Sequence, residues 1–184
     1  MRQVLKLHPE SRSTAVTAIA VEAARPSPGL LVLRYVLTGS ISDLRLPAPT
    51  PPTRVDELWR HTCFEAFVGA PDREAYLEFN LAPSSQWAAY QFTGYRQGMA
   101  PLEGFDAPGV EMKSTGQGVE LHATLDLERV AVFPTNAPWR LGLSAVIEAA
   151  DGAVSYWALA HPPGRADFHH PDCFAAELPA TERP

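Results

Sequence analysis

The residues best suited to chemistry lie in two neighbouring blocks, Glu57 to Val68 and Tyr76 to Phe92. In the first block Cys63 and Glu65 share one face of an alternating segment, so Glu65 falls in the middle of an expected strand. A carboxylate is uncommon there, because a charge on a half-buried sheet must find a partner or stay in water. Glu65 therefore either faces solvent in an ion pair or accepts hydrogen bonds from adjacent hydroxyls of a ligand in a groove.

Aromatic and polar residues near these blocks could complete a sugar site. The apolar C–H face of a pyranose packs on an aromatic ring, while its hydroxyls need fixed donors and acceptors. Side chains of these types are Trp59, Trp87, Tyr95, Asn80, Gln91 and Arg96. Trp139 and Trp157 are expected to pack in the core, since large aromatics dominate core burial.

A second polar cluster lies between His161 and Phe174 and contains histidines, aspartates and Cys173. These are metal-ligand types, but their spacing matches no zinc signature. His169 and His170 are adjacent, so in an extended segment they point to opposite sides. We expect a loop over one end of the fold that forms a wall of a ligand site, and a structural metal ion is the alternative.

Catalytic signatures do not occur in the sequence. It contains no G-x-S-x-G elbow, no phosphate-binding loop and no H-E-x-x-H helix. Glu65 and Glu78 lie on neighbouring expected strands, and a pair of glutamates alone is weak evidence for glycoside hydrolysis. The sequence therefore predicts that the protein is not an enzyme.

Short alternating segments must position these residues. Leu31 to Thr38 shows the clearest period of two, and similar segments are Gln3–His8, Ala15–Ala23, His61–Val68, Ala75–Leu81, Gln86–Phe92, Val110–Ser114, Val119–Leu125, Leu141–Glu148, Val154–Leu159 and Cys173–Leu178. Proline- and glycine-rich turns separate them, and Leu127–Val132 is the one expected helical turn. Ten or eleven short strands predict an all-β, two-sheet antiparallel β-sandwich of the jelly-roll or immunoglobulin-like kind.

Composition limits the partners and the compartment. The chain has 184 residues, a formal net charge of −6 and 18 prolines, which favours one domain over residues 1–184 without long helices. The acidic balance excludes a nucleic-acid partner. Two cysteines are too few for a disulfide scaffold. No leader segment or membrane span is visible, so we expect a cytoplasmic protein.

The motifs W-x-x-x-C-x-E, at Trp59 to Glu65, and EFNLAPS, at Glu78 to Ser84, resemble the DOMON-like domains related to family 9 carbohydrate-binding modules. The later blocks Leu125–Pro162 and Pro171–Pro179 resemble further strands of that family. The resemblance extends from about Gln3 to Leu178. The most similar subgroup is bacterial, and some of its members are found next to or fused with UDP-N-acetylenolpyruvoylglucosamine reductase.

The resemblance implies a β-sandwich that holds a small polar ligand, such as a sugar or nucleotide-sugar, in a groove around Trp59 and Glu65. In the sugar-binding relatives the pyranose lies between two tryptophans. Trp59 matches the first tryptophan, and Phe168 and Trp157 are the candidates for the position of the second. The predicted ligand-binding residues are Trp59, Glu65, Asn80, Trp87, Arg96, His161, Phe168 and His169.

Two alternatives follow from the same resemblance. Some DOMON domains hold haem b between a methionine and a histidine, which here would be Met99 with His161 or His169. The domain would then be an electron carrier. The other alternative is a module whose groove binds a protein partner.

Overall fold

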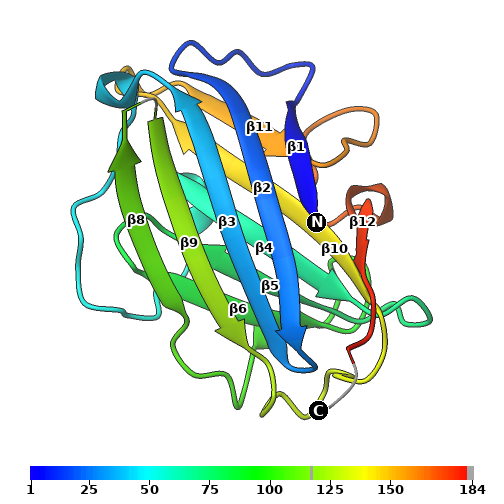
Figure 1. The fold of residues 1–184 in the computed structure, drawn as a ribbon. Helices are drawn as coiled ribbons and strands as arrows, with labels where there is room; N and C mark the ends of the chain where they lie inside the picture. The colour runs from blue at the N-terminus through cyan, green and yellow to red at the C-terminus, as the bar shows by residue number, and fades with distance from the viewer. Residues whose placement is uncertain (117, 182–184) are drawn as a thin grey trace.

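A computed structural model describes residues 1–116 and 118–181. Within these residues the chain forms twelve β-strands and three single-turn 3₁₀ helices (Figure 1). The strands are β1 (Arg2–Leu7), β2 (Val16–Ser27), β3 (Leu30–Gly39), β4 (Cys63–Gly69), β5 (Tyr76–Leu81), β6 (Trp87–Phe92), β7 (Ala100–Pro101), β8 (Gly109–Thr115), β9 (Gly118–Asp126), β10 (Trp139–Glu148), β11 (Val154–Ala158) and β12 (Ala176–Leu178). The 3₁₀ helices are η1 (Ile41–Asp43), η2 (Leu58–Arg60) and η3 (Pro171–Cys173). No helix of the described residues has the length and apolar character needed to cross a membrane.

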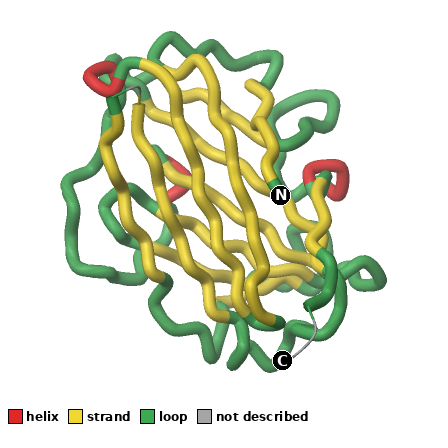
Figure 2. The backbone as a smooth tube through the Cα atoms, viewed as in Figure 1, coloured by secondary structure: helices red, strands yellow, loops and turns green. Residues whose placement is uncertain are grey.

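The strands form one continuous twelve-stranded antiparallel sheet. It folds over at β1 into two layers that pack face to face, named here the front and back sheets, as Figures 1 and 2 show. The front sheet consists of β2, β3, β9 and β8, and the back sheet of β7, β6, β5, β4, β10 and β11, with β12 paired to β10. Strand β1 joins the two sheets, because Arg2–Leu5 pair with β2 while Lys6 and Leu7 pair with β11. The predicted all-β sandwich is confirmed.

The main core fills the space between the sheets. Alternating apolar residues of β3 and β4 meet there, and the rings of Tyr35 and Phe64 lie 5.0 Å apart. The Tyr35 hydroxyl donates a 2.7 Å hydrogen bond to the backbone carbonyl of Glu65, so the one polar atom of this ring is satisfied inside the core. Trp139 is fully buried in the same layer.

The back sheet is also covered on its second face. Every residue of β4 and β5 is buried, because η2 and the segment 161–174 pack over this face. Leu58, Phe67, Val146 and Phe168 belong to the small apolar cluster formed there. A strand covered on both faces buries the side chains of both faces and loses the clear alternation of apolar and polar residues. Glu65 lies on the second face of β4 and is buried for this reason.

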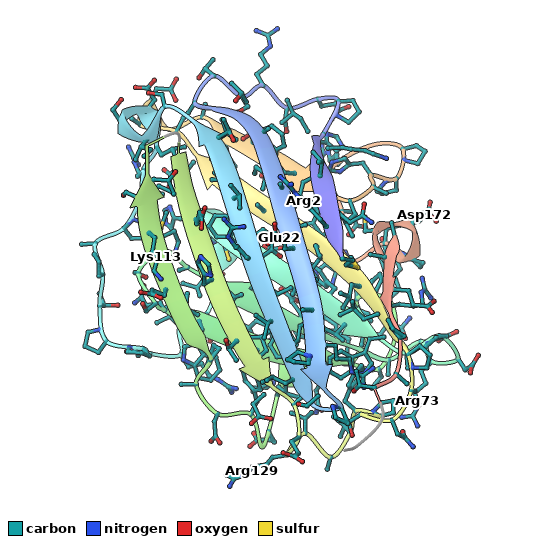
Figure 3. All side chains as sticks on the ribbon, viewed as in Figure 1. Arg2, Glu22, Arg73, Lys113, Arg129 and Asp172 are labelled. Atoms are coloured by element: carbon teal, nitrogen blue, oxygen red, sulfur yellow. The ribbon has the colours of Figure 1, made fainter. Side chains whose placement is uncertain are left out.

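The outer face of the front sheet is charged. Arg34 on β3 forms ion pairs with Glu22 at 3.1 Å and with Glu120 at 2.7 Å, and Arg2 and Glu22 project from this face in Figure 3. Such exposed pairs contribute little to stability, so the front sheet presents an ordinary solvated surface.

Several details differ from the sequence predictions, among them the three 3₁₀ helices, none of which lies in the segment expected to form a helical turn. The two-residue strand β7 was not predicted. Leu127–Val132 forms no helix but successive turns, with hydrogen bonds from the Val130 amide to Leu127 and from the Phe133 amide to Val130. Leu127, Val130 and Phe133 all enter the core, and this spacing of three suits single turns rather than a continued helix. The last strand begins at Ala176, because Cys173 ends η3.

Candidate ligand-binding groove

A groove of about 1280 Å³ lies on the outer face of the back sheet. Its floor consists of side chains from β4, β5, β6 and β10. Its walls come from the loop segments 8–12, 56–59, 96–101 and 165–169 and from the start of β11. Loops that are distant in sequence therefore surround a rigid sheet surface, an arrangement typical of binding sites.

Two carboxyl groups form the polar part of the floor. Glu65 faces Asn80 on β5 and Ser144 on β10 in the strand register, and the Ser144 hydroxyl donates a 3.1 Å hydrogen bond to Glu65 Oε2. Glu78 follows diagonally on β5, and Asn80 Nδ2 donates a 2.6 Å bond to its Oε1. Diagonal cross-strand neighbours lie about 7–8 Å apart at the Cα atoms, which long side chains can span.

Burial controls the charge of both carboxyl groups. Removal from water raises the pKa of Glu65 to about 8; the charge of Glu78 adds to the rise, and the bond from Ser144 opposes it. Burial also raises the pKa of Glu78, against the hydrogen bond from Asn80 and the charge of Arg96. Glu65 is therefore a neutral carboxylic acid at neutral pH and can both donate and accept hydrogen bonds.

Aromatic side chains line the groove beside these acids. Trp59 lies in η2 and is 48% exposed, although aromatic residues of this size usually bury most of their surface. Glu57 precedes η2 in a left-handed conformation, with φ 61°, and so turns the chain over the sheet. Tyr90 and Phe168 are buried against the floor, and the Tyr90 hydroxyl donates a 2.6 Å bond to Asp56.

An ion pair and a hydrogen bond join two of the loops that line the groove. Arg96 Nη2 lies 2.7 Å from Asp167 Oδ1, and the Tyr95 hydroxyl also donates to Asp167. His169 lies beside them, with Nδ1 2.8 Å from the Tyr76 hydroxyl and Nε2 3.8 Å from Glu78 Oε2. Burial lowers the pKa of His169 to about 4 and the charge of Arg96 adds to this effect, so His169 is neutral at pH 7.

Five of the eight predicted site residues line the groove, namely Trp59, Glu65, Arg96, Phe168 and His169. Asn80 lies beside the floor and supports Glu78. His161 lies next to His8 and donates from Nε2 to the Lys6 carbonyl.

Trp87 and Trp157 are placed elsewhere, since both lie in the core between the sheets. The alternation of β6 explains the position of Trp87. Trp87 shares its parity with Ala89, a core residue, whereas Tyr90 and Phe92 have the opposite parity and line the groove. The same alternation places Tyr156, instead of Trp157, in the groove. The alternation of side chains along β6 and β11 would therefore have predicted Tyr90 and Tyr156 as groove residues.

The residues proposed for haem do not fit an axial ligand pair. Both ring nitrogens of His169 face protein groups, namely the Tyr76 hydroxyl and the Glu78 carboxyl group. His161 does not line the groove; its Nε2 is held by the Lys6 carbonyl, and its Nδ1 is buried away from the groove without a partner among the described residues. For the metal alternative, residues 1–116 and 118–181 contain no group of three or more potential ligands placed to hold an ion.

Comparisons with known proteins give structural matches alone. No protein-family model matches this sequence, and no curated protein matches it. A candidate carbohydrate-binding protein from Bacteroides uniformis has a similar structure, with a TM-score of 0.68 and 12% identity. The match covers 94% of this chain and 83% of that protein.

Two structures of a family 9 carbohydrate-binding module from Caldicellulosiruptor kristjanssonii, each with a TM-score of 0.58 and 10% identity, are also similar. One is in complex with cellotriose, and the match covers 89% of this chain and 74% of that one. The other is in complex with glucose, with coverage of 98% and 86%. This chain therefore has the β-sandwich fold found in family 9 carbohydrate-binding modules.

Proposed function

We propose that this chain is a non-catalytic carbohydrate-binding domain that holds a sugar or sugar derivative in the groove around Trp59 and Glu65. One observation carries the proposal: a half-exposed tryptophan lines the same groove as two buried, hydrogen-bonded carboxyl groups. An exposed indole offers a surface for the apolar face of a pyranose, and the acids offer fixed partners for its hydroxyls. The sandwich shared with family 9 modules supports the proposal, as does the order of the sequence motifs that resemble DOMON-like domains.

The placement of the acids argues for binding without hydrolysis. Glycosidases place one carboxyl group at the leaving oxygen and the other across the sugar ring. Here Glu65 and Glu78 project from one face of one sheet, so both approach a bound ligand from the same side. Burial also raises the pKa of both groups, whereas a nucleophile or general base must be ionised.

A nucleotide-sugar is a more specific form of this proposal. Arg12 and Arg165 line the groove, and no ion pair within the described parts of the chain involves either of them. Guanidinium groups at the rim could contact the phosphates while the sugar occupies the floor.

Calorimetric titration with glucose, cellotriose and UDP-glucose tests the proposal. We expect Trp59→Ala to weaken sugar binding about tenfold or more, as loss of a central aromatic contact does. Val132→Ala is the matched control, because Val132 is 57% exposed and lies outside the groove. Absence of binding by all three ligands, or equal affinities of the wild type and Trp59→Ala, contradicts the proposal.

A further inference from the structure

No basic side chain within residues 1–116 and 118–181 forms an ion pair with Glu65. Glu65 is only 3% exposed, and its one side-chain hydrogen bond within residues 1–116 and 118–181 comes from the neutral Ser144 hydroxyl. Oε1 lacks a partner in this part of the chain, and the side chain lines the groove. Oε1 is open to the groove, so a ligand group can form a hydrogen bond or ion pair with it without displacing a protein partner.

The basic residues of the groove do not compensate for this carboxyl group. Arg96 is held by Asp167 at 2.7 Å. His169 approaches Glu78 rather than Glu65. The groove contains more acidic than basic residues, with Glu10, Asp56, Glu57, Glu65 and Glu78 against Arg12, Arg96 and Arg165. Glu65 is itself neutral in the free protein, and a positively charged ligand group would stabilise the ionised form of the two floor acids.

We propose that the ligand carries an ammonium group, as an amino sugar does, and that this group lies between Glu65 and Glu78. This inference rests on the proposed function and narrows its ligand class. The two side chains are diagonal neighbours on adjacent strands, so one ammonium with three donors can reach both carboxyl groups. A hydroxyl at the same position can donate only one hydrogen bond.

Proton release distinguishes the ammonium group from a hydroxyl. In the free protein Glu65 is protonated below about pH 8. The ammonium stabilises the ionised form, so the Glu65 carboxyl group gives one proton to the buffer when the ion pair forms. Affinity for an amino sugar must then rise with pH, approaching about tenfold per pH unit well below that pKa. A neutral sugar leaves the Glu65 proton in place, and its affinity stays flat.

Other titratable groups face this site and must be considered. Cys63 shares the face of β4 with Glu65, and Tyr35 approaches the Glu65 backbone from the front sheet. Burial and the charge of Glu65 raise the pKa of both groups, so they remain neutral from pH 5 to 7. The other titratable groups that line the groove are His8, Glu10, Arg12, Asp56, Glu57, Glu78, Tyr90, Arg96, Tyr156, Arg165 and His169.

The test compares glucose with glucosamine, which differ in one substituent. Calorimetric titrations of the full chain at pH 5, 6 and 7, each in two buffers of different ionisation enthalpy, give the affinity and the protons released. We expect affinity to rise with pH for glucosamine alone, with proton release. Glu65→Gln, which has the shape of the neutral acid, should abolish both effects. Glu111→Gln on β8 makes the same chemical substitution outside the groove and should preserve them.

The outcomes separate the two proposals. Glucose binding that equals or exceeds glucosamine binding at every pH, with no proton release, overturns the ammonium site and leaves the carbohydrate-binding function supported. Binding of neither sugar overturns both proposals. Because Glu65→Gln could alter the groove, Ser144→Ala provides a second variant. It removes the hydrogen bond that lowers the Glu65 pKa, so the proton release should persist to higher pH.

Discussion

Replacement of Glu65 by glutamine should make the protein more stable at alkaline pH. The folded-state pKa of Glu65 is about 8, against an ordinary value of 4.5. Between these values the unfolded chain loses the proton while the folded chain keeps it, so stability falls as pH rises. Glutamine fills the same volume and does not titrate.

The magnitude follows from the two pKa values. At about 1.4 kcal/mol per pH unit, a shift from 4.5 to about 8 corresponds to roughly 5 kcal/mol of stability lost above pH 8. Between pH 5 and pH 8 we expect the wild type to lose up to about 4 kcal/mol relative to Glu65→Gln. Glu78 is present in both proteins, so its own titration largely cancels in the comparison.

Urea unfolding at pH 5, 6.5 and 8 measures this difference. Glu111→Gln serves as the control, because Glu111 is exposed on the front sheet and pairs with Lys113 at the surface, where an ion pair is worth little. A difference between the wild type and Glu65→Gln that is constant with pH, or that shrinks as pH rises, would refute the reasoning on Glu65 burial.

Three further predictions concern the core, the groove wall and the front sheet. Tyr35→Phe should destabilise the fold by about 1 kcal/mol in urea unfolding, because the Glu65 carbonyl loses its hydroxyl donor; an unchanged midpoint would contradict this. His169 should remain neutral above about pH 5, since burial holds its pKa near 4, and NMR titration midpoints near the usual 6.5 would contradict that. The same shift predicts a loss of stability as pH falls from 6.5 towards 4, because only the unfolded chain then gains the His169 proton. Gly118→Ala should cost more than about 2 kcal/mol in thermal unfolding, because its new Cβ would lie 1.8 Å from the Leu37 carbonyl oxygen; an unaltered melting temperature would exclude this close approach.

Much of the fold could be predicted from local pattern. The period of two over Leu31–Thr38 places Leu33 and Tyr35 in the core, as the structure confirms. The sequence predicts one helical turn over Leu127–Val132, and the structure has successive single turns there, because a spacing of three between apolar residues suits both. The strand β7 is too short to leave a pattern in the sequence.

The groove could be predicted only in part. The sequence predicts Glu65 because a carboxylate within a strand is unusual, and it predicts Trp59 from the W-x-x-x-C-x-E motif. Trp87 was placed in the groove on residue type, whereas its parity within β6 directs it to the core. The place of Glu78 in the groove depends on the pairing of β4 with β5, which the sequence alone does not show.

The sequence by itself determined the strands, the face on which each side chain lies, and the unusual position of Glu65. These are local properties, because steric limits on the backbone make successive side chains alternate. The tertiary structure decided which strands pair, and so placed Glu78 diagonally to Glu65. It also decided that the segment 161–174 covers the second face of the back sheet and removes Glu65 from water. Register and burial arise from contacts between distant residues, and these contacts convert an ordinary carboxylate into a neutral acid on the floor of a groove.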